Sequence, residues 1–255
     1  METFRAAVLA EWTKLRTIRS TVWTLLFYVA ATMAVTVLAG LFVGGNYAKM
    51  SAADKAALDP ISIGFTGTRF GVLALVVFGV LAMSSEFSSG AIRTFLVAVP
   101  RRGVFYAAKL LAASLVTLAV CAATVLVSFC VTQALLGEAG VSLTDQGAAR
   151  AVVCGVFYAV LLLLFSMGLA ALLRSAALTI GILLPLFFMV SGILLSLPGT
   201  RSVAQFLPDA AGGVAMDGKP MDGLLLTPLT GMAVLVAWAA AAVAAGYLAL
   251  RRRDA

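Results

Sequence analysis

The residues of this chain best suited to chemistry form a charged segment between two long apolar stretches. The segment starts at an acid, contains a proline and ends among basic residues: Glu86, Ser89, Gly90, Ile92, Arg93, Leu96, Pro100, Arg101, Arg102 and Lys109. The segment has one acid among several basic residues and no nucleophile beside a base. This composition suits ion pairing with another protein better than catalysis. The segment therefore predicts a contact site for a partner that drives this chain.

The rest of the chain lacks the side chains that catalysis and metal binding usually need. It has no histidine, the usual proton shuttle and commonest metal ligand. Its cysteines lie in apolar runs without CxxC spacing, which predicts packing groups: Cys121, Cys130 and Cys154. Residues 213–219 match the start of the phosphate-loop pattern GxxxxGK, but Pro220 replaces the required Ser or Thr. We expect no enzyme activity, no cofactor and no metal in this chain.

The composition predicts a membrane environment. Of the 255 residues, 62% are hydrophobic and 11% charged, and the mean hydropathy is +1.08, which leaves too little polar surface for a soluble protein. A helix needs about 20 apolar residues to cross a bilayer. Six continuous runs qualify: 22–43, 64–85, 110–136, 151–173, 176–197 and about 227–250. Their continuity excludes barrel strands and predicts an all-α integral membrane protein with six transmembrane helices in a single domain, 1–255.

The basic residues predict the orientation. If the N-terminus is cytosolic, only six of the 18 Lys and Arg face outward: Lys49, Lys55, Arg69, Arg150, Arg201 and Lys219. They are outnumbered there by seven acids: Asp54, Asp59, Glu138, Asp145, Asp209, Asp217 and Asp222. The positive-inside rule then puts both termini in the cytosol. We interpret the net charge of +7 as an orientation signal and an attraction to anionic lipid, with no nucleic-acid partner.

The first 21 residues predict a helix lying in the membrane interface. Apolar residues recur at spacings of three and four, flanked by arginines: Phe4, Val8, Trp12, Leu15, Ile18 and Val22. Glu11 points to the apolar side of this helix, where an unpaired carboxylate is costly. Either it has a basic partner elsewhere in the protein, or it reaches the lipid headgroups or pairs with Lys14 one turn later.

The charged segment, 86–106, predicts a short amphipathic helix on the cytosolic side. Pro100 ends the helical pattern and leaves a basic corner at Arg101 and Arg102. The apolar side chains between 88 and 99 share one face: Ile92, Phe95, Leu96 and Val99. A plain positive-inside loop is the alternative, and it explains the arginines but not the apolar face.

Arg69 comes early in the second apolar run, between Gly67 and Gly71. Either it reaches water at the membrane interface, or it lines a pathway. The GxxxG spacings, here and at Gly40 to Gly44, permit close helix contact.

The connections on either side of the fifth apolar run differ in length and composition. The Arg174-Ser175 link is too short to hold a partner and predicts a tight hairpin. Residues 198–227 alternate apolar side chains with prolines and glycines, which predicts either short broken helices that re-enter the membrane or a plain surface loop.

Taken together, these stretches resemble the ABC-2 type transporter permeases, especially a compact six-helix branch found in antibiotic-producing and related bacteria. The resemblance covers nearly the whole chain. Residues 11–16 look like that family's N-terminal amphipathic helix, and 86–109 look like its E-x-x-x-G-x-I-R-x-x-L-x-x-x-P-x-R stretch. Further similar pieces are Phe206-Leu207-Pro208, Gly212-Gly213, residues 228–231 and Arg252-Arg253-Asp254.

The resemblance implies a half-transporter in a bacterial plasma membrane. Two such permeases, identical or different, pair, and two separate cytosolic ATPase subunits bind ATP and Mg and drive them between inward-facing and outward-facing states. The expected ATPase contacts are Glu11, Lys14, Glu86, Ser89, Gly90, Arg93, Pro100, Arg101 and Arg102. The outer segment before the last helix would close the extracellular gate, with Phe206, Pro208 and Arg69 as its candidate residues.

We therefore expect the membrane subunit of an exporter for a hydrophobic or amphipathic compound, such as a drug, a peptide antibiotic or a lipid-like molecule. The same fold could instead serve antibiotic immunity or sensing. An ion-coupled carrier normally needs an acid at mid-membrane, and the only acid near a predicted span is Glu86. A membrane-embedded enzyme would need a nucleophile with a base, which the sequence does not offer.

Overall fold

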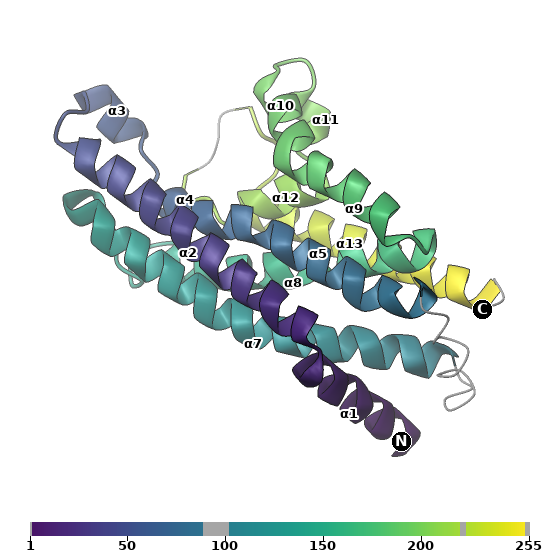
Figure 1. The fold of residues 1–255 in the computed structure, drawn as a ribbon. Coiled ribbons are helices and arrows are strands. Elements are labelled where there is room, and N and C mark those ends of the chain that lie inside the picture. The colour runs from purple at the N-terminus through teal and green to yellow at the C-terminus, as the bar shows by residue number, and fades with distance from the viewer. Residues whose placement is uncertain (1, 89–101, 220–222, 253–255) are drawn as a thin grey trace.

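The computed structural model describes residues 2–88, 102–219 and 223–252, and over these residues it is all-helical (Figure 1). Within them, six helical stretches are long and apolar enough to cross a membrane: Arg19–Tyr47, Pro60–Ser85, Arg102–Ala139, Ala148–Leu173, Ala176–Ser196 and Pro228–Arg252. The prediction of six apolar spans is confirmed. The third span begins at Arg102, however, and not near residue 110, because the helix starts eight residues before the apolar run does.

Within the described residues, the N-terminal half contains three long α-helices and three shorter ones. α1 (Glu2–Thr17) and α2 (Arg19–Tyr47) are separated by an extended Ile18. α3 (Ala52–Ala57) and α4 (Pro60–Gly64) follow, in the region predicted as an outer loop, each capped by the residue that precedes it. α5 (Thr66–Ser88) and α7 (Arg102–Leu136) complete this half, and η1 (Gly137–Ala139) extends α7 by a short 3₁₀ turn.

The C-terminal half contains the interrupted helices. α8 (Ala148–Leu173) leads into α9 (Ala176–Pro185), whose proline precedes a π-helical turn, η2 (Leu186–Val190), and then α10 (Ser191–Ser196). α11 (Arg201–Ala204) and α12 (Pro208–Val214) are short helices, and α13 (Pro228–Arg252) is long. Short helices are thus present within residues 198–227, as one of the two alternatives predicts, and their re-entry into the membrane stays a prediction.

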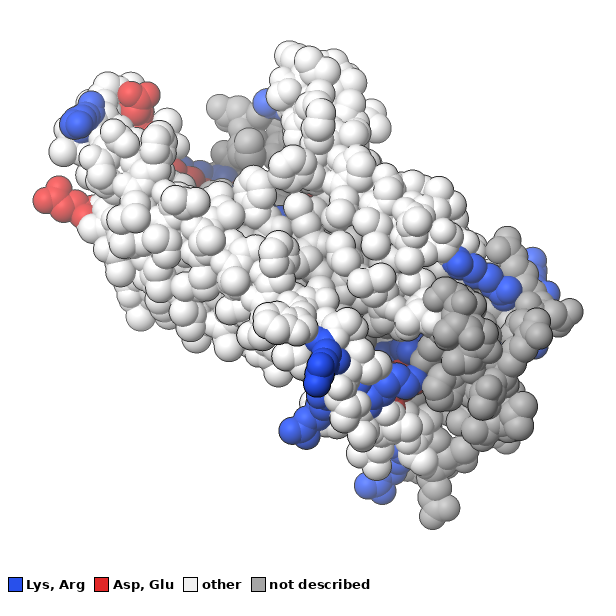
Figure 2. Space-filling view, viewed as in Figure 1, with Lys and Arg blue, Asp and Glu red and all other residues white. Residues whose placement is uncertain are grey.

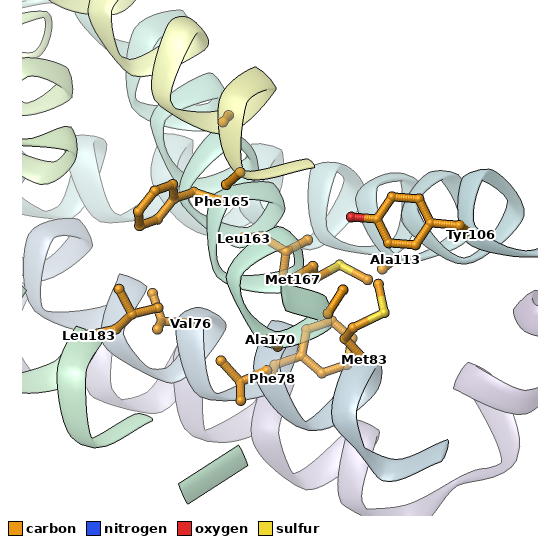
Figure 3. Packing of buried hydrophobic residues seen from close by; sticks show 14 of the residues in the cluster. Val76, Phe78, Met83, Tyr106, Ala113, Leu163, Phe165, Met167, Ala170 and Leu183 are labelled. Carbon is orange, nitrogen blue, oxygen red and sulfur yellow. The ribbon is translucent and has the colours of Figure 1, made fainter. Parts of the chain in front are cut away.

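The core lies around α8, which packs against α5, α7 and α13. Figure 3 shows buried side chains of α5, α7, α8 and α9 converging on one cluster that includes Val76, Met83, Tyr106, Leu163, Met167 and Leu183. α2, in contrast, presents large exposed apolar side chains, among them Trp23, Phe27, Leu38 and Phe42. Such a surface would be unfavourable in water and suits lipid.

Small residues let the helices approach closely. A side chain at Gly67 or Gly71 of α5 would collide with Thr36 or Thr32 of α2, and one at Gly44 would collide with the backbone of α7. The predicted close contacts at both GxxxG spacings are therefore confirmed.

The predicted hairpin between the fourth and fifth spans is also present. α8 ends at Leu173, Arg174 adopts a left-handed conformation with φ of 53°, and the Ser175 hydroxyl accepts a hydrogen bond from the Leu178 amide (3.3 Å). α9 then starts at once.

Charge separates along the bundle. In Figure 2, blue side chains gather at the end where α1 lies, the middle is almost entirely white, and charged side chains of both signs return at the opposite end, near α3. Figure 1 places both ends of the chain at the α1 end. We refer to the α1 end as the inner end and to the α3 end as the outer end, following the charge rule.

Candidate functional site

A cavity of about 280 Å³ opens near the outer end, between α5, α8, α10 and the short helices α11 and α12. One wall is apolar and includes Phe187, Phe188, Leu195 and Val214. The other residues include seven polar or charged side chains: Arg69, Tyr158, Ser191, Arg201, Gln205, Asp209 and Asp217. This mixture of an apolar wall and a few converging polar groups is typical of small-molecule sites.

Close packing places α12 at this cavity. Pro208 begins the helix and is buried. A Cβ at Gly212 would lie 2.6 Å from side-chain atoms of Leu235 and Tyr158, and one at Gly231 would collide with the Ala211 carbonyl. The glycines of the predicted outer segment therefore allow α12 to sit directly against α8 and α13.

The partly exposed side chain of Arg69 is held in place by hydrogen bonds. Its Nη2 donates to the carboxylate of Asp217, with which it forms an ion pair, and to the carbonyl of Gly213 (3.1 Å). The Ser62 hydroxyl donates to the same carboxylate (2.7 Å). Arg69 lines the cavity and its side chain is 37% exposed, which fits both interpretations, a residue that reaches water at the membrane interface and one that lines a pathway. A role of Arg69 in transport stays a prediction.

Asp209 is the other acid of the cavity. Its carboxylate accepts a hydrogen bond from the Ser191 hydroxyl (2.8 Å), and among the described residues it has no ion pair. Burial raises the pKa of Asp209 to about 6, although the hydrogen bond from Ser191 and backbone hydrogen bonds act in the opposite direction. Asp209 is therefore a carboxyl group that titrates near neutral pH.

Three further groups bind the segment after α12 to its neighbours. The Asp59 carboxylate accepts hydrogen bonds from the amides of Gly218 (2.8 Å) and Lys219 (3.0 Å). The Lys219 ammonium donates to carbonyls before α4, and Arg150 of α8 donates to the carbonyls of Ala215 and Asp217. The stretch that partly matches a phosphate loop thus uses its amides on a carboxylate of the same chain.

Phe206 and Pro208, the other predicted gate residues, do not line the cavity. Phe206 is 41% exposed, and its carbonyl accepts a hydrogen bond from the Trp238 indole (2.8 Å). The structure brings Arg69 to the cavity but leaves these two beside it.

At the inner end, α1 is joined to α7 by a buried ion cluster. Glu11 and Lys109 are only 5% and 4% exposed. Lys109 Nζ lies 3.1 Å from one Glu11 carboxylate oxygen, and Lys14 Nζ lies 2.7 Å from the other. Lys109 also donates to the Ala82 carbonyl of α5 (3.2 Å). The predicted distant basic partner and the predicted local pair with Lys14 are therefore both present.

Two residues of the charged segment differ from the prediction. Arg102 starts α7 and donates to the Leu250 carbonyl of α13 (2.9 Å), so it is partly buried and not a free exposed corner. Lys109 is buried in α7, although the sequence placed it on an inner connection. In both cases the cause is the early start of α7, which carries these side chains into helix contacts.

The remaining predicted contact residues cannot be placed. Residues Ser89, Gly90, Arg93, Pro100 and Arg101, and with them the amphipathic helix predicted over 88–99, lie outside the described residues, as does the side chain of Glu86. Their role in partner binding stays a prediction. Glu11 and Lys14 are described, but their ion pairs lie within this chain.

Sequence reasoning missed Tyr158, Ser191, Gln205, Asp209 and Asp217 as cavity residues. One feature of the sequence pointed to Asp209: it follows Leu207-Pro208 in an apolar stretch, where a charged residue is unusual. Tyr158 and Ser191 lie in long apolar runs, where nothing in the sequence separates a cavity-facing side chain from a lipid-facing one.

Within the described part of the chain, no group of three or more His, Cys, Asp or Glu residues is arranged to hold a metal ion. No protein-family model matches the chain, and no curated protein matches it. The transporter family indicated by the sequence motifs is therefore a matter for proposal.

Proposed function

We propose that this chain is the membrane-spanning permease subunit of an ATP-driven exporter, and that a separate cytosolic ATPase supplies its energy. The order and spacing of the sequence motifs support the family. The observation that carries the proposal is the buried cluster of Glu11, Lys14 and Lys109, because it joins the amphipathic helix α1 to α7, right beside the charged segment expected to meet the ATPase.

The cluster connects α1 to the transmembrane helices, so a movement of α1 would be transmitted to them. A force on the inner surface that moves α1 also moves α7, since separating Glu11 from Lys109 would leave buried charges unpaired. Lys109 contacts the Ala82 carbonyl as well, so α5 moves with them. The helices that enclose the charged segment would therefore respond together, as a rigid-body change requires.

At the outer end, the same helices reach the proposed gate. Arg69 of α5 is bonded to Asp217 and to the carbonyl of Gly213, the connection between α5 and the outer segment. A tilt of α5 would pull on this connection and change the access to the cavity. The cargo would be a hydrophobic or amphipathic compound, because the cavity has an apolar wall.

Purification of the full chain from its native membranes tests the ATPase partner. We expect a cytosolic protein with a complete phosphate loop to co-purify with it. We also expect the complex, reconstituted in vesicles, to move a lipophilic probe only when ATP is present. Accumulation of the probe by the chain alone would contradict the proposal.

A charge reversal in the charged segment tests the contact itself. Arg93→Glu, and separately Glu86→Lys, should abolish ATP-dependent transport while membrane insertion and the amount of folded chain stay unchanged. Arg251→Glu is the matched control, since Arg251 is an exposed arginine in the last turn of α13. If both variants transport like the control, the segment has no part in coupling.

Asp209 favours a second candidate, an ion-coupled carrier. A partly buried carboxyl with a pKa near 6 is able to exchange a proton at physiological pH. This candidate predicts transport that collapses with a protonophore while ATP remains high. Transport that instead persists under those conditions and stops on ATP depletion would favour the ATP-driven exporter.

A further inference from the structure

We propose that the outer cavity binds a small amphipathic organic cation, with Asp209 as the counter-ion of its ammonium group. This deepens the proposed function by naming a substrate class, and it rests on that function only for the claim that the bound molecule is transported. Binding itself requires no ATPase.

Among the charged residues around the cavity, Asp209 is the acid without an ion pair in the described part of the chain. Arg69 and Asp217 neutralise each other in an ion pair, and the Arg201 Nε donates to the Leu195 carbonyl (2.9 Å). Among the residues that the structure describes, the Asp209 carboxylate forms no ion pair with a lysine or an arginine. A partly buried carboxylate with only hydrogen bonds is costly to ionise, and a cationic ligand would remove that cost.

The cavity offers a second polar group. Tyr158 is only 3% exposed and lines the cavity, yet its hydroxyl makes no hydrogen bond within the described residues. An ammonium group has three N–H donors. One can be accepted by the Asp209 carboxylate and another by the Tyr158 hydroxyl.

The apolar wall would receive the rest of the ligand. Its side chains are Phe187 and Phe188 of η2, Leu195 of α10, Val214 of α12, and Leu224. Phe188 is 61% exposed and packs edge-on against Phe70 of α5 (ring centroids 5.9 Å apart). An aromatic or alkyl body would gain burial against these side chains, and the aromatic faces also favour a nearby cation.

The volume limits the size of the ligand. A cavity of about 280 Å³ is at the small end of the range for ligand sites, about 300 to 1,000 Å³. It suits one aromatic ring with a short alkylammonium chain, or that portion of a larger molecule. Phenylbutylammonium, phenylbutanol and phenylbutanoate share such a body and differ only in the charge of the head.

The site also predicts a pH dependence. The titratable and charged groups that face Asp209 are Arg69 from α5, Tyr158 from α8, Arg201 from α11 and Asp217 after α12. Among these groups, Asp209 is an acid whose pKa is raised by burial. Because its pKa is raised to about 6, cation binding should strengthen as the pH rises from 5 to 7.5.

Equilibrium dialysis of the full chain in lipid nanodiscs against the three radiolabelled probes tests the head group, with empty nanodiscs of the same lipid as the partition control. We expect phenylbutylammonium to bind at least about tenfold more tightly than phenylbutanol at pH 7.5, the gain of one charge-assisted hydrogen bond. Tighter binding of phenylbutanoate would mean that Arg69 and Arg201 select an anion, and it would overturn the proposal.

Two variants test the residue. Asp209→Asn should weaken phenylbutylammonium binding at least about tenfold and leave phenylbutanol unaffected. Asp145→Asn, which removes an exposed outer acid away from the cavity, should change neither. Equal binding of the cation to Asp209→Asn and to the natural chain would also overturn the proposal.

Ser191→Ala gives a test that keeps the carboxylate. It removes the hydrogen bond that lowers the pKa of Asp209, so the midpoint of cation binding should move to higher pH. An unmoved midpoint would exclude Asp209 as the titrating counter-ion, even if Asp209→Asn does not fold. Since no ATPase is present in these assays, failure of cation binding and failure of ATP-driven export are separate results.

Discussion

At the scale of single residues, the environment of a charged side chain decides how much it contributes to stability. Glu11 and Glu138 are both glutamates in helices, but Glu11 is 5% exposed and pairs with two lysines, whereas Glu138 is exposed. Exposed ion pairs contribute about 0 to 1 kcal/mol, while loss of one partner from a buried pair costs much more because the other charge stays buried. The residue-level predictions therefore concern two acids, the buried Glu11 and the partly buried Asp209.

Lys109→Met should lower the free energy of unfolding by about 3 kcal/mol, because Glu11 would keep only Lys14 as an ionic partner in a buried site. Unfolding of the purified chain in mixed micelles measures the change. Lys49→Met, which removes an exposed lysine, is the control and should have little effect. The double variant Glu11→Gln with Lys109→Met should recover part of the loss. Similar stability of Lys109→Met and the control would show that the cluster is not stabilising.

Asp209→Asn should stabilise the chain at pH 8 by roughly 2 kcal/mol and have almost no effect at pH 4. The pKa of Asp209 in the folded state is about 6, above its ordinary value of 3.8, so the folded chain holds this proton more tightly than the unfolded chain. Stability from this group is full below about pH 4 and is lost as the pH rises through 6. Unfolding curves of both chains between pH 4 and 8 measure it. A constant difference across that range would contradict the raised pKa.

At the scale of elements, the close approach of neighbouring helices explains why some positions require glycine. Gly212 and Gly213 are neighbours in α12, yet a Cβ at the first would meet Leu235 and Tyr158 at 2.6 Å, and a Cβ at the second would meet nothing within 4 Å. The short helix therefore has one face against α8 and α13 and one open face. The π-helical turn after Pro185 is the other local feature that shapes the cavity, since Phe187 and Phe188 line the cavity from this turn and Ser191 lines it from the start of α10. Such turns are frequent at functional sites.

Gly212→Ala should destabilise the chain by about 1 to 3 kcal/mol through overpacking, whereas Gly213→Ala should be neutral or slightly stabilising because alanine favours helix. Thermal unfolding of both variants, side by side, measures the difference. Equal effects of the two substitutions would show that α12 is not packed against α8 as described.

Gly67→Ala tests the contact between α2 and α5. The new methyl group would collide with Thr36 and with the carbonyl of Thr32, so the helices must separate, and we expect a loss of about 1 to 3 kcal/mol. Gly45→Ala is the control, because a Cβ there meets nothing within 4 Å. A stable Gly67→Ala variant would contradict the close helix contact.

At the scale of the whole molecule, the charge distribution and the apolar surface decide how the chain sits in a membrane. Six helical stretches are long enough to cross, and the uncharged middle of the surface in Figure 2 lies between two charged ends. The inner end carries the greater share of the basic residues. Orientation is therefore the property that the positive-inside rule predicts most directly.

Single-cysteine labelling tests that orientation. In a chain whose three cysteines are replaced by alanine, Asp54→Cys in α3 should react with a membrane-impermeant maleimide in intact cells, whereas Arg251→Cys in α13 should react only after permeabilisation. Both positions are exposed, so differences in burial do not explain the result. The opposite pattern would invert the topology and remove the proposed contact with a cytosolic ATPase.

The sequence by itself determined the six spans, the helix before the first of them, the hairpin at Arg174 and the broken outer segment. These follow from local composition, periodicity and turn residues, which act within a few neighbours along the chain. The sequence also indicated that Glu11 needed a basic partner and that glycines permitted close contacts. Only the tertiary structure decided that Lys109 is that partner and that Arg69, Tyr158, Ser191 and Asp209 surround one cavity. Pairings between residues about 100 positions apart depend on how helices rotate and pack, and a continuously apolar run carries no polar stripe that would reveal which face turns inward.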